Sequence, residues 1–368
     1  MVEDLHFSGY ETWVEKEGLP VYGGWGIHPP DLKLVPWDRM GANAALLHLE
    51  AMGDTCTDIV LEIGPGASTK PVKHMYEELV YVLSGRGATS VWLDESKKNT
   101  FEWQPGSLFG IPLNATYQHF NGSGDESARF VSVTNLPLMM NMFHNEEFIW
   151  NTNFQFSDRL GNESYFLGEG IMHDVEAGRH WWETNLLADA PNFELRPMEK
   201  RGAGGINLQF NLANASMHTH ISQFPIGTYK KAHGHAPGAH IVLLSGVGYS
   251  LIWPDGKNWI GNGGGFEERV MVPWKPGSIF VPMGYHQHFN TGPEPARYLA
   301  MGFGGFRYHI GAPAMGTRED AAGMDKNVEE GGIQIEYENE DPRILPLFEE
   351  ECIKNGSASK MREFLGKA

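Results

Sequence analysis

The run Gln-His-Phe-Asn occurs twice in this chain, at 118–121 and at 287–290. Each copy follows a Trp-x-Pro-Gly-Ser sequence at matching distance, and further upstream each carries Leu-Ser-Gly-x-Gly. The earlier motifs lie at 103–107 and 83–87 in the first copy, and at 274–278 and 244–248 in the second. Three motifs in the same order indicate an internal duplication, so the two copies can be compared residue by residue.

Composition narrows the class of protein. The 368 residues suffice for two domains, and an apolar content of 41% is typical of a folded protein. A net charge of −18 argues against nucleic acid as a partner. Cys56 and Cys352 give no disulfide framework or metal-type spacing. We find no signal peptide and no apolar run that could span a membrane, so we expect a cytoplasmic protein with a small-molecule substrate.

Short apolar runs separated by Gly and Pro turns predict an all-β fold of two barrels with few short helices. We expect a first barrel with an irregular arm at 1–138 and a connector at 139–190. A second barrel at 191–310 and an acidic tail at 311–368, with helices at 342–355 and near Met361, complete the chain. The arm and the connector suggest a homo-oligomer.

The second copy carries a cluster of histidines. His233 and His235 are two residues apart, and so are His286 and His288. Residues at this spacing share one face of a strand, so each pair can point into a barrel. Neutral imidazole binds Fe, Mn, Zn, Cu and Ni, and three such ligands leave positions open for catalysis. We predict a metal site here. His288 has a twin, His119, which indicates a structural role shared by both copies.

These motifs resemble those of the cupin superfamily, which implies two double-stranded β-helix (jelly-roll) barrels. The positions that match are Gly227, His233, His235, Gly246, Gly277, Pro282, Gly284, His286 and Asn290. The second copy lacks one residue before Pro282 and one before His286. It also lacks the cupin glutamate. Counting back from Gly246 places Ala239 in that position, whereas counting forward from His235 places His240 there if a β-bulge lies near 237–238. His240 is therefore a fourth candidate ligand.

The first copy fits the same template poorly. Its two histidine positions in the first motif hold Val72 and His74, and Glu78 stands in the glutamate position. Tyr117 replaces the histidine of the second motif. Loss of two ligand histidines predicts a degenerate site in the first barrel.

Substrate contacts are harder to assign. A substrate carboxylate would need a cation or a buried donor, and the candidates are Arg307, Asn207, Gln209 and His288. Arg297 has a twin in Arg129, which favours a structural salt bridge. The pair His218 and His220 is expected on an outer face or as barrel lining.

An intact second site without glutamate resembles the gentisate-type ring-cleaving dioxygenases among the cupins. The resemblance implies Fe(II) held by three histidines. It also implies that the enzyme uses O2 to cleave a C–C bond of an oxygenated aromatic or hydroxy-acid substrate. Two alternatives stay open. One is a decarboxylase, lyase or isomerase using Mn, Zn or Ni, and the other is a bicupin that binds a small ligand without turnover.

Overall fold

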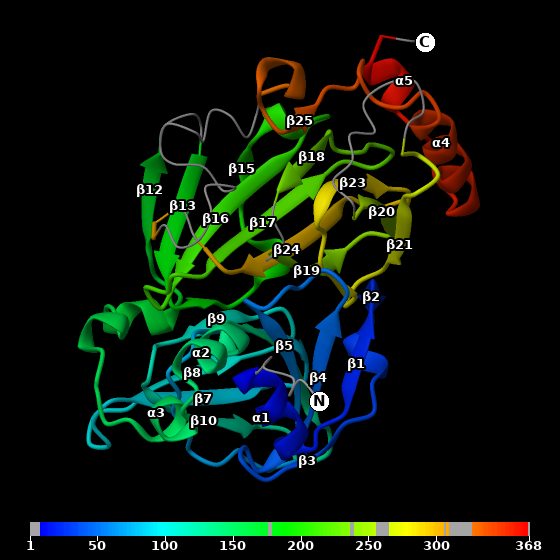
Figure 1. The fold of residues 1–368 in the computed structure, drawn as a ribbon. Coiled ribbons are helices and arrows are strands. Elements are labelled where there is room, and N and C mark those ends of the chain that lie inside the picture. Colours follow the sequence, from blue (N-terminus) through cyan, green and yellow to red (C-terminus); the bar gives the residue numbers. More distant parts are fainter. Residues whose placement is uncertain are drawn as a thin grey trace, which may run out of the picture.

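Two β-barrels lie against each other in the computed structural model, the first from the blue and cyan part of the chain and the second from the green to orange part (Figure 1). The structure describes residues 8–175, 179–235, 239–254, 265–304, 307–308 and 326–366. The prediction of an all-β fold with two barrels and few short helices is confirmed. None of the helices in these ranges is long and apolar enough to cross a membrane.

The first barrel combines a larger sheet with a three-stranded one. The larger sheet has the order β1-β4-β5-β11-β6-β9-β14, with β3 beside β4, and the smaller has the order β10-β7-β8. Its strands are β1 Val21–Gly24, β3 Val35–Trp37, β4 Ala42–Leu49, β5 Thr57–Ile63, β6 Glu78–Ser84, β7 Gly87–Trp92, β8 Asn99–Trp103, β9 Leu108–Ile111, β10 Thr116–Asn121, β11 Ala128–Thr134 and β14 Leu186–Leu187.

The second barrel repeats this plan. Its larger sheet has the order β12-β13-β16-β17-β24-β19-β22-β2, with β15 beside β16, and its smaller sheet has the order β21-β20-β23-β18-β25. Its strands are β2 Gly26–Ile27, β12 Ile171–Val175, β13 Arg179–Thr184, β15 Arg196–Pro197, β16 Ile206–Leu212, β17 His218–Phe224, β18 Ala232–His235, β19 Ala239–Ser245, β20 Gly248–Trp253, β21 Val270–Trp274, β22 Ile279–Phe280, β23 Gly284–Asn290, β24 Ala296–Gly302 and β25 Gln334–Ile335.

The repeated motifs meet in space at one end of each barrel. Gly246 has a left-handed backbone with φ +82°, which favours glycine. A Cβ on Gly248 would collide with the carbonyl oxygen of Phe289 and with the ring of Trp274. Gly87 has the same relation to Phe120 and Trp103 in the first barrel. The three motifs therefore recur together because they build one close contact between strands.

The two barrels exchange short strands. Strand β2 comes from the N-terminal arm but pairs with β22 of the second barrel, and β14 comes from the connector but pairs with β9 of the first. The arm and the connector thus hold regular strands that we had not predicted. Strands β2 and β14 leave no periodic pattern in the sequence because each has only two residues, but the connector also holds the longer strands β12 and β13.

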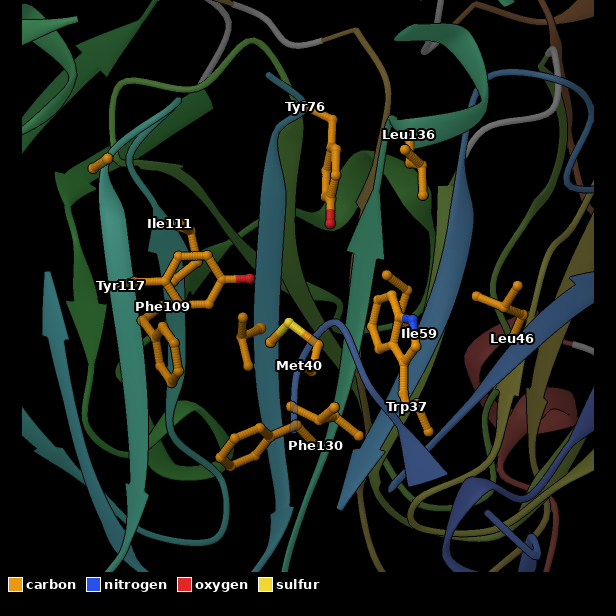
Figure 2. Packing of buried hydrophobic residues seen from close by; sticks show 14 of the residues in the cluster. Trp37, Met40, Leu46, Ile59, Tyr76, Phe109, Ile111, Tyr117, Phe130 and Leu136 are labelled. Atoms are coloured by element: carbon orange, nitrogen blue, oxygen red, sulfur yellow. The ribbon is translucent and has the colours of Figure 1, made fainter. Parts of the chain in front are cut away.

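An apolar layer joins the barrels. Leu47, Val60 and Val131 of the first barrel belong to the same buried cluster as Leu299 and Met301 of the second. A separate cluster fills the first barrel, where Phe109, Ile111 and Phe130 lie around its interior (Figure 2).

Helices cover the outside of the barrels. Helices α1 (Gly9–Glu17), α2 (Leu136–Phe143) and α3 (Glu146–Asn151) lie on the first barrel. Helix α4 (Ile344–Lys354) packs Phe348 against the rings of Tyr229 and Phe289 in the second, and α5 (Met361–Phe364) follows it. Both tail helices were predicted from the sequence and are confirmed.

Candidate metal site in the second barrel

Strand register decides which residue replaces the cupin-motif glutamate. In the first barrel Glu78 pairs with Thr134 at the start of β6, and in the second Ala239 pairs with Gly302 at the start of β19. Both pairs of strands carry a register shift near their far ends. Because the two ladders run in step, Ala239 is the structural equivalent of Glu78. The count back from Gly246 therefore matches the structure.

His240 lies on the other face of β19. Its Nδ1 is 2.7 Å from the Asp58 carboxylate of strand β5 in the first barrel, and both side chains are fully buried. Its neighbour on that face, Val242, belongs to the apolar layer between the barrels, whereas Ile241 faces the interior of the second barrel. The structure does not bring His240 together with the other predicted ligands. A shift of one residue along a strand changes the face, which is why the forward count from His235 misplaced it.

His233 and His286 face each other inside the second barrel. They are direct partners on β18 and β23, and their ring centroids are 4.4 Å apart at an interplanar angle of 63°. His288 is next along β23, with its ring 5.2 Å from that of His286 and 6.4 Å from that of His233. Three of the predicted imidazoles thus converge in one interior.

Backbone carbonyls orient the two facing rings. The Nδ1 atom of His233 lies 3.3 Å from the oxygen of Lys231, and that of His286 lies 3.1 Å from the oxygen of Gly284. A carbonyl can only accept, so each ring donates from Nδ1 and carries its lone pair on Nε2 when neutral. Metal-binding histidines are commonly held in this way. The donor chemistry of both residues therefore fits a divalent metal.

The third predicted ligand, His235, has its backbone in β18, opposite Gly284, but its side chain lies outside what the structure describes. Its equivalent in the first barrel, His74, points inward, with its ring 5.4 Å from that of Tyr117. Among the described side chains, no three His, Cys, Asp or Glu groups are placed to hold an ion. The His235 side chain is not among these described groups.

His288 belongs to a hydrogen-bonded chain present in both barrels. Its Nδ1 lies 2.8 Å from the hydroxyl of Ser250, which accepts from Trp274 Nε1 at 3.1 Å. His119 makes the same chain in the first barrel through Thr89 and Trp103, at 2.7 and 3.0 Å. Burial lowers the pKa of His119 to about 4, so it is neutral at physiological pH. The shared chain favours a positioning role for His288.

In the first barrel the side chains at the equivalent positions bond to one another. Glu78 Oε2 lies 3.1 Å from His74 Nε2 and accepts from the Tyr117 hydroxyl at 2.9 Å. Figure 2 shows the hydroxyl groups of Tyr117 and Tyr76 directed into the interior. Burial alone would raise the pKa of Glu78, but the hydrogen bond and charge of His74 outweigh it, so the pKa is lowered.

Apart from His288 on β23, the predicted substrate residues lie at the larger sheet of the second barrel, with Asn207 and Gln209 on β16 and Arg307 beside it. Arg307 is 2.9 Å from a Glu183 oxygen and donates to Asn211 at 3.1 Å. Asn207 donates to the hydroxyl of Ser222 at 2.7 Å. Gln209 lines a small pocket together with Trp181, Phe210, Asn211, Ala215, Met217, His218 and Arg307.

His220 and Arg297 belong to two neighbouring strands of the larger sheet, β17 and β24. His220 lies inside the barrel, with its ring 6.0 Å from that of Tyr298, so barrel lining is the correct alternative for this histidine. Arg297 donates to the carbonyls of Pro191 and Phe193, as Arg129 does to Pro29, Pro30 and Leu32. The twin arginines therefore share a structural role. The predicted salt bridge is present for Arg129, which also pairs with Glu62, but among the described residues Arg297 has no acidic group within 4.0 Å.

Sequence reasoning missed two residues of this interior. Lys230 is 5% exposed and donates from Nζ to the Tyr298 hydroxyl at 3.0 Å. The equivalent residues of the first barrel are Thr69 and Phe130. The comparison of the two copies contained this signal, because Thr69 is replaced by a lysine and Phe130 by a tyrosine in the copy that carries the histidines.

Comparisons with known proteins bear on the fold. Residues 59–134 match the Cupin domain family. A structure of oxalate decarboxylase from Bacillus subtilis at pH 4.6 is 14% identical, covering 76% of each chain with a TM-score of 0.47. A second Bacillus subtilis oxalate decarboxylase structure, from work on its Mn(II) centres, is also 14% identical over 76% of each chain, with a TM-score of 0.45. Similarity of this extent says nothing about a shared reaction. A search of curated proteins by sequence gives no match.

Proposed function

We propose that this chain, a bicupin by its Cupin domain match and its repeated strand topology, is a metal-dependent enzyme that works in its second barrel. His233, His235 and His286 would hold the ion. The observation that carries the proposal is the facing pair His233 and His286, which the first barrel replaces with Val72 and Tyr117. We further propose that the ion is Fe(II), and that the enzyme is a dioxygenase cleaving a C–C bond of a small oxygenated substrate.

The donor set supports this assignment. Ala239 provides no carboxylate where the first barrel has Glu78, so the proposed ligands are three neutral imidazoles. Such a set leaves the double charge of the ion uncompensated, which favours an anionic substrate that binds through two oxygens. The bound Fe(II) would supply a common site at which an electron-rich substrate and O2 exchange electrons.

The protein's own residues have three tasks in this proposal. The carbonyls of Lys231 and Gly284 orient the rings of His233 and His286 through Nδ1. Ser250 fixes His288 beside them. The buried rings of Phe280 and Tyr298 lie 5.9 and 5.3 Å from His288 and keep bulk water away from this wall.

One observation favours a second candidate. The Tyr298 hydroxyl lies in the same interior and is held by the Lys230 ammonium, so a proton donor stands ready near the histidines. A decarboxylase, lyase or isomerase that uses Mn, Zn or Ni needs such a donor for its carbanion or enolate, whereas ring cleavage by O2 does not depend on one.

Metal analysis of anaerobically purified protein tests the proposal. We expect one Fe(II) per chain and O2 uptake with a panel of catechols and hydroxybenzoates. His233→Val, which copies Val72, should remove the metal, while His74→Gln in the first barrel should leave it in place. Full occupancy in His233→Val would overturn the ligand set. Tight Mn, Zn or Ni without O2 uptake across the panel would favour the second candidate.

A further inference from the structure

We propose that Lys230, together with Tyr298, binds an anionic oxygen of the substrate, most simply a carboxylate, inside the second barrel. This inference rests on the proposed function and narrows its substrate class to organic acids.

The surroundings of Lys230 carry the argument. Its Nζ donates to Tyr298 Oη at 3.0 Å and lies 4.7 and 5.5 Å from the ring centroids of Tyr298 and Phe224. Among the described side chains, no Asp or Glu oxygen lies within 4.0 Å of this ammonium. An ammonium has three donors, and the phenol takes one of them. A buried cation among aromatic rings is strongly stabilised by an anion that accepts from its other donors.

The position of Lys230 links it to the histidines. Its backbone amide donates to the carbonyl of His288 at 3.0 Å, so the two residues are neighbours on adjacent chain segments. The ring of Tyr298 is 5.3 Å from that of His288, which in turn lies 5.2 Å from His286. An anion bound by Lys230 and Tyr298 would therefore share the interior of the proposed metal site.

The first barrel shows what these positions do without a site. Thr69 stands in place of Lys230, and its hydroxyl accepts the backbone amide of His119 at 2.9 Å. Phe130 stands in place of Tyr298 and packs in the apolar core. The scaffold thus needs neither the ammonium nor the phenol at these two positions.

The other cations of this region already have partners. Arg297 donates to two backbone carbonyls, and the charge of Arg307 is matched by Glu183. Lys231, the neighbour of Lys230, forms an ion pair with Glu336. Among these four cations of the second barrel, Lys230 is consequently the one suited to bind an anion.

A matched pair of probes tests the proposal. Catechol and 3,4-dihydroxybenzoate present the same two chelating oxygens, and only the second carries a carboxylate. Binding of each to anaerobic, Fe(II)-loaded protein is measured by calorimetry, and acetate is titrated into metal-free protein. Lys230→Thr and Tyr298→Phe copy the first barrel. The control is Lys275→Gln, which copies Gln104 at an exposed turn away from the histidines.

We expect the wild type and Lys275→Gln to bind 3,4-dihydroxybenzoate at least tenfold more tightly than catechol. Lys230→Thr should lose this preference while its affinity for catechol is unchanged, and Tyr298→Phe should reduce the preference severalfold. Equal affinities in the wild type, or a preference that survives Lys230→Thr, would overturn the proposal. If the protein holds no metal, the proposed function fails, but acetate binding that depends on Lys230 would still support the anion site. If acetate does not bind either, the anion site is overturned as well.

Discussion

The contact between His240 and the Asp58 carboxylate gives the sharpest stability prediction, because both side chains are fully buried between the barrels with Nδ1 and Oδ1 2.7 Å apart. Replacing one member leaves the other without its partner in an apolar layer. Such a loss costs about 3–5 kcal/mol, whereas replacing both members with apolar groups is often close to neutral. We therefore expect His240→Leu to lower the free energy of unfolding by about 3–5 kcal/mol.

The duplication supplies the double variant. Leu79 and Thr219 occupy the equivalent positions, since Leu79 pairs with Val133 as His240 does with Met301, and Thr219 pairs with Met301 as Asp58 does with Val133. The variant that combines Asp58→Thr with His240→Leu thus copies the other half of the interface. We expect it to lie within about 2 kcal/mol of the wild type.

Urea unfolding followed by tryptophan fluorescence provides the assay for this cycle. Lys16→Met, which removes the exposed pair with Glu146, is the control and should change the free energy by less than about 1 kcal/mol. The reasoning is refuted if His240→Leu has the midpoint of the control, or if the double variant loses the sum of the two single losses.

Three further predictions concern other parts of the fold. In the unfolded chain His119 takes up a proton near pH 6.5, while burial lowers its folded pKa to about 4. The neutral His119 therefore costs nothing above pH 6.5, and the free energy of unfolding falls by up to about 3 kcal/mol as the pH drops to 4. Urea titrations should show that His119→Gln reduces this dependence on pH. An unchanged dependence in the variant would contradict the lowered pKa of His119. Gly248→Ala should abolish soluble expression because of its collision with Phe289, whereas Gly64→Ala, which meets nothing within 4 Å, should express normally. Phe348→Ala should cost about 3–5 kcal/mol by removing the anchor of α4, measured as a fall in Tm; a shift below 2 °C would show that the helix is not coupled to the barrel.

The sequence predicted the fold well because repeated turn motifs depend on local chemistry. Glycines at 85, 87, 246 and 248 are required by backbone geometry and by close approach of a neighbouring strand, so they mark the same place in both barrels. The exchanged strands β2 and β14 were not predictable, because each has two residues and is defined only by its partner in the other barrel.

The candidate site was predicted less evenly. Facing positions of His233 and His286 followed from motif spacing and strand periodicity. The place of His240 could not be decided by counting, because one residue more or less changes the face of a strand. Lys230 lies between Gly227 and His233, at a position that the first cupin motif leaves unspecified, so no spacing rule pointed to it, and only the comparison with Thr69 reveals it.

The exchange of β2 and β14 has a consequence for any attempt to study the barrels separately. A chain cut within the connector before Leu186 would leave the edge of β9 without its neighbour, and the separated second half would lack β2. Each fragment would also expose the apolar layer that now lies between the barrels. Open sheet edges and apolar faces recruit other chains. We therefore expect the duplicated halves to fold as one unit.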